Sequence, residues 1–157
     1  MQGITPFLWY DDKAEDAANF YTSVFKNSKI VRTSRYGDAG PGPKGSVMTV
    51  DFELDGQKFI ALNAGPRFTF TEAVSFVVHC ENQQEVDHYW EKLQSGGGSP
   101  SQCGWLKDRF GLSWQVVPTV LGQLMTGDPK KANAVMQALL KMTKLDIAKL
   151  QEAYDRG

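Results

Sequence analysis

One polar amide, that of Gln115, lies within the otherwise largely apolar run 112–117. The run 112–117 reads as a strand and ends at Pro118, which has no backbone N–H and cannot continue a central ladder. Alternation along a strand places Gln115 on the same face as Ser113 and opposite Trp114. Burying an amide without partners is costly, so Gln115 either faces a wet cavity or bonds to a neighbour. In both cases it can donate and accept hydrogen bonds without an ion.

The residues that could act as bases or nucleophiles do not form a recognisable catalytic pattern. His79 and His88 are the only two histidines. His79 shares a strand face with Ser75 and could reach one end of a cavity, whereas His88 lies beside the apolar stripe of a helix. A nucleophilic Cys103 would need a base beside it, and no Cys/His signature is visible. We interpret these residues as a strand-end histidine, a solvated helix histidine and a buried thiol.

The sequence also lacks a nucleotide-binding motif. The glycine-rich stretch 37–45 is not GxGxxG between a strand and a helix, and its two prolines would block the helix N-terminus that a phosphate requires. No glycine-rich turn of the common S-adenosylmethionine-binding fold is visible either. We predict instead that 37–45 is a mobile loop at the rim of a cavity.

Composition excludes several classes of partner. The 157 residues are 41% hydrophobic and 22% charged, which is typical of one globular domain. A net charge of −1 provides no large field for nucleic acid or an anionic membrane, so neither is expected as a partner. No apolar run is long enough to span a bilayer, and no signal peptide is visible. Cys80 and Cys103 form no CxxC pair or disulfide framework, so we predict a reducing, cytoplasmic location.

The first half of the sequence predicts a strand, a helix and three further strands. Asp12 and Glu15 resemble a capping box, and apolar residues at helical spacing follow them. Asp55-Gly56 between two alternating runs predicts a hairpin. The predicted strands are 4–10, 29–36, 46–54 and 57–63, with the helix ending near 26–27.

The second half repeats this order. A strand at 73–80 precedes Asn82 and Glu85, a second capping-box signature, and the helix that follows ends at the glycines 96–98. Two short strands joined by a turn complete the half, and we interpret Lys107 to Arg109 in that turn as a solvated hairpin end. The repeat indicates an internal duplication of a βαβββ unit.

The C-terminal residues predict helices. Asp128-Pro129 is a cap followed by proline at the first helical position, and Thr143 with Asp146 resembles a second cap. The helices are too apolar to face water on all sides, so we expect them to pack on the sheet or on a second subunit. This favours a homodimer.

Several motifs together resemble a known family. The chain is similar to the vicinal-oxygen-chelate superfamily, which includes glyoxalase I, extradiol dioxygenases and antibiotic-resistance proteins. More closely it resembles the PhnB-like branch, labelled the 3-demethylubiquinone-9 3-methyltransferase family. The motifs are Thr5-Pro-Phe-Leu-Trp-Tyr, Asn19-Phe-Tyr-Thr-Ser-Val-Phe25, Phe59-Ile-Ala-Leu-Asn-Ala-Gly-Pro66, Ser75-Phe-Val-Val, Cys103-Gly-Trp-Leu-Lys-Asp-Arg-Phe-Gly-Leu-Ser-Trp-Gln and the tail from Met136 to Leu150.

The resemblance implies one α+β domain over residues 1–157. Two βαβββ modules, 1–66 and 67–118, would form a curved mixed sheet around a cavity, with a helical tail at 119–157, usually within a dimer. Metal-using members draw ligands from four positions, which fall here on Thr5, Asn63, Ser75 and Gln115. Those members place His, Gln or Glu at these positions, so Thr5, Asn63 and Ser75 depart from the pattern and only Gln115 keeps it.

Together these expectations predict a protein that binds a small molecule in a cavity. We predict no cofactor and no bound metal. The predicted cavity is lined by Thr5, Asn63, Ser75, Gln115, Trp105 and Phe70, and it would hold a small molecule between aromatic walls and convergent amides and hydroxyls. Whether the protein is an enzyme stays open. The alternatives are a metal-dependent lyase or isomerase, the methyltransferase of the family label, and a dimeric interaction module with a vestigial cavity.

Overall fold

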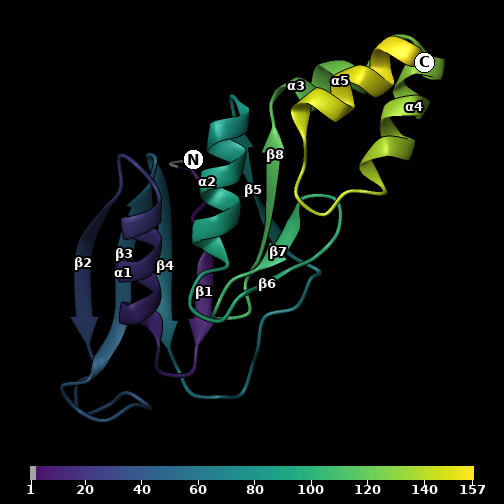
Figure 1. Cartoon of the computed structure of the whole chain (residues 1–157). Helices are drawn as coiled ribbons and strands as arrows, with labels where there is room; N and C mark the ends of the chain where they lie inside the picture. Colours follow the sequence, from purple (N-terminus) through teal and green to yellow (C-terminus); the bar gives the residue numbers. More distant parts are fainter. Residues whose placement is uncertain (1–2) are drawn as a thin grey trace. The chain divides into compact units, whose positions relative to one another are not determined.

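A computed structural model describes residues 3–157 as two compact units. Unit 1 ends at Phe70, and unit 2 runs from Thr71 to Gly157. Each unit contains one four-stranded sheet, so the strands form two sheets rather than one continuous sheet (Figure 1). The predicted α+β class and the repeated βαβββ order are confirmed.

Unit 1 is a sheet covered by one helix. Its strands lie in the order β1-β4-β3-β2, with β1 parallel to β4 and the other neighbours antiparallel. The duplicated order thus places the first and last strands of the module side by side. The elements are β1 (Phe7–Tyr10), α1 (Ala14–Val24), β2 (Lys29–Arg35), β3 (Val47–Leu54) and β4 (Gln57–Asn63).

The core of unit 1 lies between α1 and its sheet. Helical spacing brings small residues and Tyr21 to the buried face of α1, and Tyr21 packs on Phe52 with ring centroids 6.1 Å apart. Phe52 in turn stacks on Phe59 at 5.4 Å. Three buried alanines, Ala14, Ala17 and Ala18, let the helix lie close to the strands.

The start of α1 differs from the predicted capping box. The helix begins at Ala14, its N-cap residue is Lys13, and Lys13 makes no side-chain cap bond. Instead, the backbone N–H of Ala14 donates to Oδ1 of Asn63 at 2.8 Å. A residue at the end of β4 therefore satisfies one of the free N–H groups of the first turn.

The glycine-rich loop after β2 folds around an aromatic ring. Tyr36 is buried, and its hydroxyl donates to the backbone oxygen of Asn63. A Cβ added at Gly40 or Gly42 would lie 2.4 Å from the Tyr36 ring. The glycines are thus needed for close approach to this ring, a reason that composition alone did not indicate.

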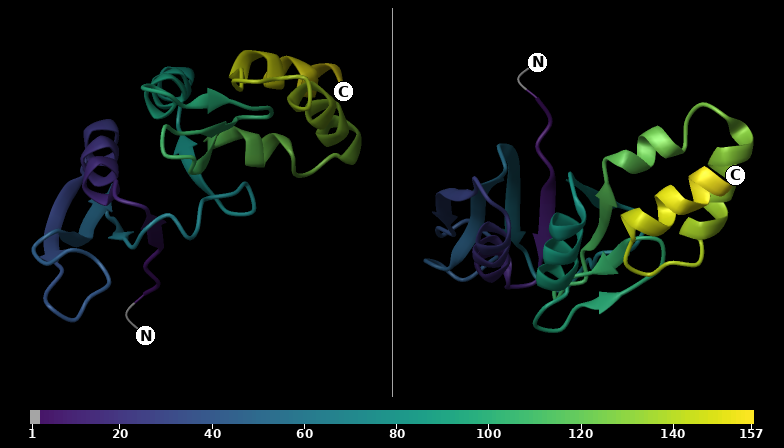
Figure 2. Two further views of the ribbon diagram at one scale, coloured as in Figure 1. Left: turned by 90° about the horizontal axis from the view of Figure 1, so that it is seen from below. Right: turned by 45° about the horizontal axis from the view of Figure 1, so that its top comes forward.

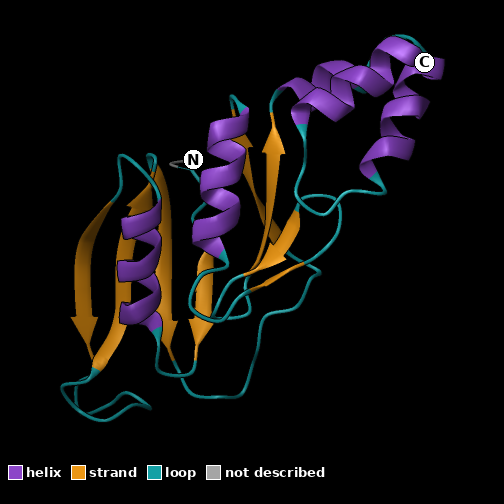
Figure 3. Ribbon diagram, in the orientation of Figure 1, coloured by secondary structure: helices purple, strands orange, loops and turns teal. Residues whose placement is uncertain are grey.

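Unit 2 repeats the plan and adds a tail. Its strands lie in the order β5-β8-β7-β6, with β5 parallel to β8. Figure 3 shows the helices and strands of the unit by type. The elements are β5 (Ser75–Cys80), α2 (Gln83–Leu93), β6 (Ser99–Pro100), β7 (Trp105–Lys107) and β8 (Ser113–Pro118).

The start of α2 follows the predicted local cap. Asn82 Oδ1 accepts a hydrogen bond from the backbone N–H of Glu85 at 2.9 Å. The Glu85 carboxylate accepts from the backbone N–H of Glu81 at 2.8 Å. One free N–H of the first helical turn is therefore satisfied by Asn82, and the Glu85 side chain bonds in return to the residue just before the cap.

The tail forms α3 (Val120–Leu124), α4 (Pro129–Leu139) and α5 (Ile147–Arg156). Asp128 caps α4 as predicted, whereas α5 is capped by Asp146 without Thr143. Helix α3 lies within the predicted helical tail, although no cap motif indicated its bounds. The helices pack around a small core of buried residues, Leu124, Val135, Leu145 and Leu150. Figure 2 shows α5, in yellow, lying beside α4. No helix within residues 3–157 has the length and apolar character needed to cross a membrane.

Candidate functional site

Strands β5, β8 and β7 of unit 2 bring polar side chains to one face of their sheet. Ser75 pairs in register with Ser113, which pairs on its other side with Lys107. In the next row Gln115 lies beside Trp105 of β7. Because side chains two apart along a strand share a face, these five residues line the same side of the sheet. We call Ser75, Trp105, Lys107, Ser113 and Gln115 the polar face.

Gln115 is held by a neighbour on this face. Its Nε2 donates to Oγ of Ser75 at 2.9 Å, and both side chains are half-buried. Of the two alternatives left by the sequence, a bond to a neighbour is therefore formed. Trp114 lies on the opposite side of β8, buried against Phe76 with ring centroids 5.7 Å apart. The predicted placement of Gln115 and Trp114 on opposite faces of the strand is confirmed.

Ser113 is the residue of the polar face that the sequence analysis did not single out. It is 1% exposed. Among residues 3–157, its Oγ is the one buried side-chain nitrogen or oxygen atom without a hydrogen-bond partner. Such atoms are rare in folded proteins, because leaving a buried hydroxyl unpaired costs about 1–3 kcal/mol. Alternation along the strand predicted the face on which Ser113 lies, but it could not predict that the hydroxyl has no hydrogen-bond partner.

The charge on the polar face is balanced. The ammonium of Lys107 forms an ion pair with the carboxylate of Glu72, a residue of the segment before β5. The hydrogen bond from Lys107 holds the pKa of the Glu72 carboxyl below its ordinary value. About half of each side chain is exposed to solvent, so the ion pair contributes little to stability, but it balances the charge of the lysine next to Ser113.

The turn between β7 and β8 is not the solvated hairpin end that the sequence indicated. Asp108 is 3% exposed, and its Oδ1 accepts from the backbone N–H groups of Phe110 and Leu112 at 2.8 and 3.1 Å. Arg109 does lie at the surface, where its guanidinium bonds to Ser95. The buried carboxylate therefore fixes the turn that joins the two strands of the polar face.

The other predicted site residues, Thr5, Asn63 and Phe70, belong to unit 1. Thr5 is exposed before β1. Asn63 lies on the side of its sheet that faces α1, where its Nδ2 donates to the backbone oxygen of Val47 at 3.2 Å. Phe70 packs edge-on against Tyr10, with ring centroids 5.2 Å apart. Within one unit, the structure brings together Ser75, Gln115 and Trp105.

Two open pockets lie away from the polar face, one in each unit. The pocket of unit 1 has a volume of about 520 Å³ and lies between the start of α1 and the glycine-rich loop. Asn63 and four exposed carboxylates contribute to its wall: Asp11, Asp12, Glu15 and Asp16. The pocket of unit 2, of about 710 Å³, lies between the starts of α2 and α5.

The residues of the polar face do not fit a divalent metal ion. Hydroxyls and one amide stand where a stable site needs imidazole or carboxylate groups. Within residues 3–157, no three His, Cys, Asp or Glu side chains gather in a way that could hold a metal. His79, on the same side of β5, is exposed.

Comparison with known proteins identifies a family. Residues 2–117 match the family model of 3-demethylubiquinone-9 3-methyltransferase. The chain is 41% identical to the PhnB protein of Bacillus cereus, covering 75% of this chain and 100% of that one, with a TM-score of 0.68. No curated protein matches the chain. The family match ends before α3, so the expected resemblance of the tail lies outside it.

More distant structures share the fold. Protein PA1353 of Pseudomonas aeruginosa is 19% identical, covers 75% of this chain and 98% of its own, and has a TM-score of 0.63. The fosfomycin resistance protein FosX of Listeria monocytogenes is 13% identical, covers 81% of this chain and 99% of its own, and has a TM-score of 0.58. At these identities the similarity concerns the fold alone.

Proposed function

The chain belongs to the 3-demethylubiquinone-9 3-methyltransferase family, the PhnB-like branch of the vicinal-oxygen-chelate superfamily, and from this premise we propose that it binds a small molecule at the polar face without a metal ion. The single observation that carries the proposal is the unpaired hydroxyl of Ser113 beside the Gln115–Ser75 hydrogen bond. Because Ser113 is buried, a ligand would have to displace neighbouring side chains to reach its hydroxyl, and a ligand oxygen or N–H would then give this hydroxyl the partner that it lacks.

The chemistry of the polar face favours a neutral, oxygen-bearing ligand. Gln115 and the two serines can both donate and accept hydrogen bonds, so a carbonyl or a hydroxyl group would suit them. The charge of Lys107 is already balanced by Glu72 and does not demand an anion. The half-buried ring of Trp105 would pack on an apolar part of the ligand.

The test is the replacement Gln115→Leu. This change removes the amide and leaves the Ser75 hydroxyl half-buried, where water can replace the lost bond, so folding should be affected by only about 1 kcal/mol. Binding should fall by about tenfold or more, because a ligand polar group would face a leucine. The measurement is untargeted mass spectrometry of small molecules released from purified wild-type protein and from the variant.

A matched control is Gln84→Leu, because Gln84 is exposed on α2. The proposal predicts a small molecule released by the wild type and by Gln84→Leu but depleted in Gln115→Leu. Equal release from all three proteins, or no released molecule at all, would exclude the polar face as the site. A variant that unfolds would instead assign Gln115 a structural role.

The alternative is that the protein is an enzyme, and the name of its family supports a methyl transfer. The titratable side chain on the same side of β5 is His79, which would have to take a proton from an acceptor hydroxyl. Incubation with isotopically labelled S-adenosylmethionine and a demethylated quinone tests this alternative. Transfer of label that is lost in His79→Gln would favour it over simple binding. A divalent ion retained through purification would instead favour the lyase or isomerase.

We further propose that the protein acts in the cytoplasm. Cys80 and Cys103 are both free thiols, which suits a reducing compartment. Fractionation of cells that express a tagged chain tests the location, and recovery from an oxidising compartment would contradict it.

A further inference from the structure

The loop between α4 and α5 forms backbone hydrogen bonds with the two residues that precede β7. The N–H of Cys103 donates to the carbonyl of Met142, and the N–H of Gly104 donates to the carbonyl of Thr143, both at 2.8 Å. These two donors immediately precede Trp105. We call residues 142–147 the strap.

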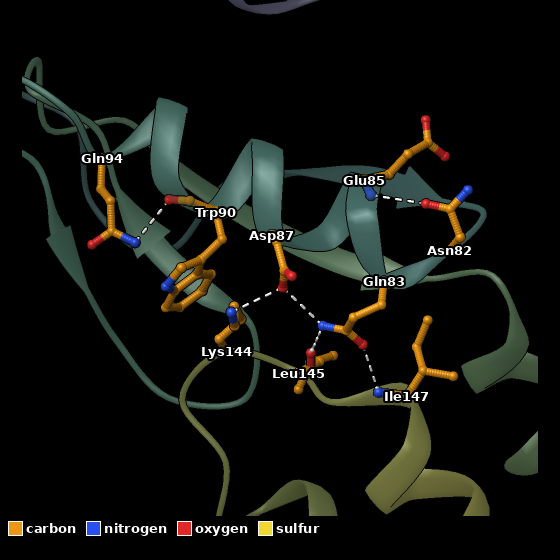
Figure 4. Close-up of polar contacts among 9 residues, drawn as sticks. All are labelled: Asn82, Gln83, Glu85, Asp87, Trp90, Gln94, Lys144, Leu145 and Ile147. Carbon is orange, nitrogen blue, oxygen red and sulfur yellow. Dashed lines mark hydrogen bonds and ion pairs between the residues drawn. The ribbon is translucent and has the colours of Figure 1, made fainter.

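Gln83, in the first turn of α2, holds the strap with both ends of its amide (Figure 4). Its Oε1 accepts from the N–H of Ile147 at 2.9 Å, and its Nε2 donates to the carbonyl of Leu145 at 3.1 Å. The same Nε2 donates to Asp87 at 3.0 Å, and Asp87 pairs with Lys144 at 2.9 Å. One glutamine therefore ties the helix that covers the sheet to the C-terminal end of the strap.

A short path of contacts leads from the strap to the polar face. The carbonyl of Gly104 accepts from the N–H of Val116 at 2.8 Å, so the residue bound by the strap is also bonded to the neighbour of Gln115. Gly104 has φ +85°, and a Cβ there would lie 3.1 Å from the side chain of Leu145 and 2.9 Å from the carbonyl of Val116. Only glycine allows the strap and the two strands to approach this closely.

We propose that the strap sets the positions of Trp105 and Gln115, and that Gln83 is the positioning residue that holds the strap in place. The part of this inference that concerns ligand binding rests on the proposed function, whereas the part that concerns geometry does not. It assigns a role in the site to a tail that begins after the residues matched by the family model.

The experiment compares Gln83→Met with Gln84→Met by ¹⁵N-resolved NMR of the full chain. Methionine keeps the length and flexibility of glutamine but removes its hydrogen bonds, and Gln84 is the exposed neighbour. In Gln83→Met we expect shifted signals for the Gly104 and Val116 amides and for the Gln115 side-chain NH₂. Amide exchange at Gly104 should accelerate by about tenfold, because a local contact is lost. Signals of unit 1, such as that of Ala61, should not move.

A strap that only adds stability would give a different result. It would lower the midpoint of unfolding in Gln83→Met and leave the native-state signals of Gln115 and Val116 in place, which would overturn the inference. If Gln83→Met does not fold, Lys144→Gln weakens the same contact at an exposed ion pair and should shift the same signals by smaller amounts. Unchanged signals in that variant would overturn the inference equally.

The outcomes also separate this inference from the proposed function. Shifted Gln115 signals in a protein that releases no small molecule would support the positioning role and contradict the binding function. If wild type and Gln83→Met both release a molecule and the Gln115 signals are unchanged, the binding function would be supported and the positioning role contradicted.

Discussion

The indole N–H of Trp114 donates to the carboxylate of Asp108 at 2.9 Å, and both residues are buried. The bond joins the turn after β7 to the apolar side of β8. The second carboxylate oxygen of Asp108 accepts two backbone N–H groups of the same turn. A buried charge is tolerated when it is hydrogen-bonded on all sides, and this arrangement makes the turn a fixed part of the candidate site.

Asp108→Ala should therefore be strongly destabilising. Three donors would lose their acceptor in a buried setting, and we expect the free energy of unfolding to fall by about 3 kcal/mol or more. Urea denaturation followed by tryptophan fluorescence measures the change. Asp38→Ala is the control, because Asp38 forms only an exposed ion pair with Lys44 and should change stability by less than about 0.5 kcal/mol. Equal effects of the two variants would contradict the assigned role.

Alanine substitutions at two glycines with nearly equal φ angles can distinguish the cost of steric contact from the cost of backbone strain. Gly104 has φ +85° and Gly111 has φ +87°, but a Cβ would meet neighbours within 4 Å only at Gly104. Alanine at either position would have to adopt the left-handed backbone conformation, which is energetically unfavourable for a residue with a Cβ atom. Gly104→Ala should lose about 1–3 kcal/mol more than Gly111→Ala, because it also overpacks the strap. Thermal unfolding of the two variants compares them directly, and the same loss in both would remove the evidence for tight packing.

The two cysteines should differ in reactivity. Cys80 is fully buried, and burial, with a smaller contribution from the charge of Glu85, raises the pKa of its thiol from 9.0 to about 12. At pH 8 a disulfide reagent should react with the half-buried Cys103 in the native protein and with both thiols after unfolding. Because the unfolded thiol of Cys80 ionises first, its contribution to stability should be lost as pH rises from 9 to 12. Equal native-state labelling of both cysteines would be inconsistent with this burial.

We expect the protein to form a homodimer through its tail. Helix α4 buries Val135 in the tail core, while Met136 on α4 and Leu140 just after it stay 37% and 59% exposed. Sedimentation at micromolar concentration should show twice the 17.5 kDa mass of one chain. Leu140→Glu should shift the protein to a monomer, whereas Gln137→Glu on the same helix should not. A wild-type monomer would refute the prediction.

Local patterns predicted the elements that depend on local contacts. The hairpin at Asp55-Gly56 is confirmed, since both residues have positive φ, 47° and 84°, as the tight turn requires. The cap of α2 lies within one turn of the helix and was predicted. The cap of α1 was not, because its acceptor belongs to Asn63, 49 residues away.

The candidate site was predicted in part for the same reason. Alternation placed Gln115 on one side of β8 and Trp114 on the other, since both depend only on strand geometry. The burial of Asp108 depends on how the turn folds back over Trp114, so a charged turn sequence was interpreted as solvated. The Ser113 hydroxyl lacks a partner only because of what surrounds it in three dimensions.

The cap supplied by Asn63 has a consequence for the order of folding. The cap of α2 comes from residues next to it in sequence and is available before any strands pair, whereas α1 lacks its side-chain acceptor until β4 has joined the sheet. We therefore expect the amides of α2 to become protected early and those of α1 only with β3 and β4, which pulsed hydrogen exchange during refolding would detect. The two halves of a duplicated sequence would then fold along different routes to the same topology.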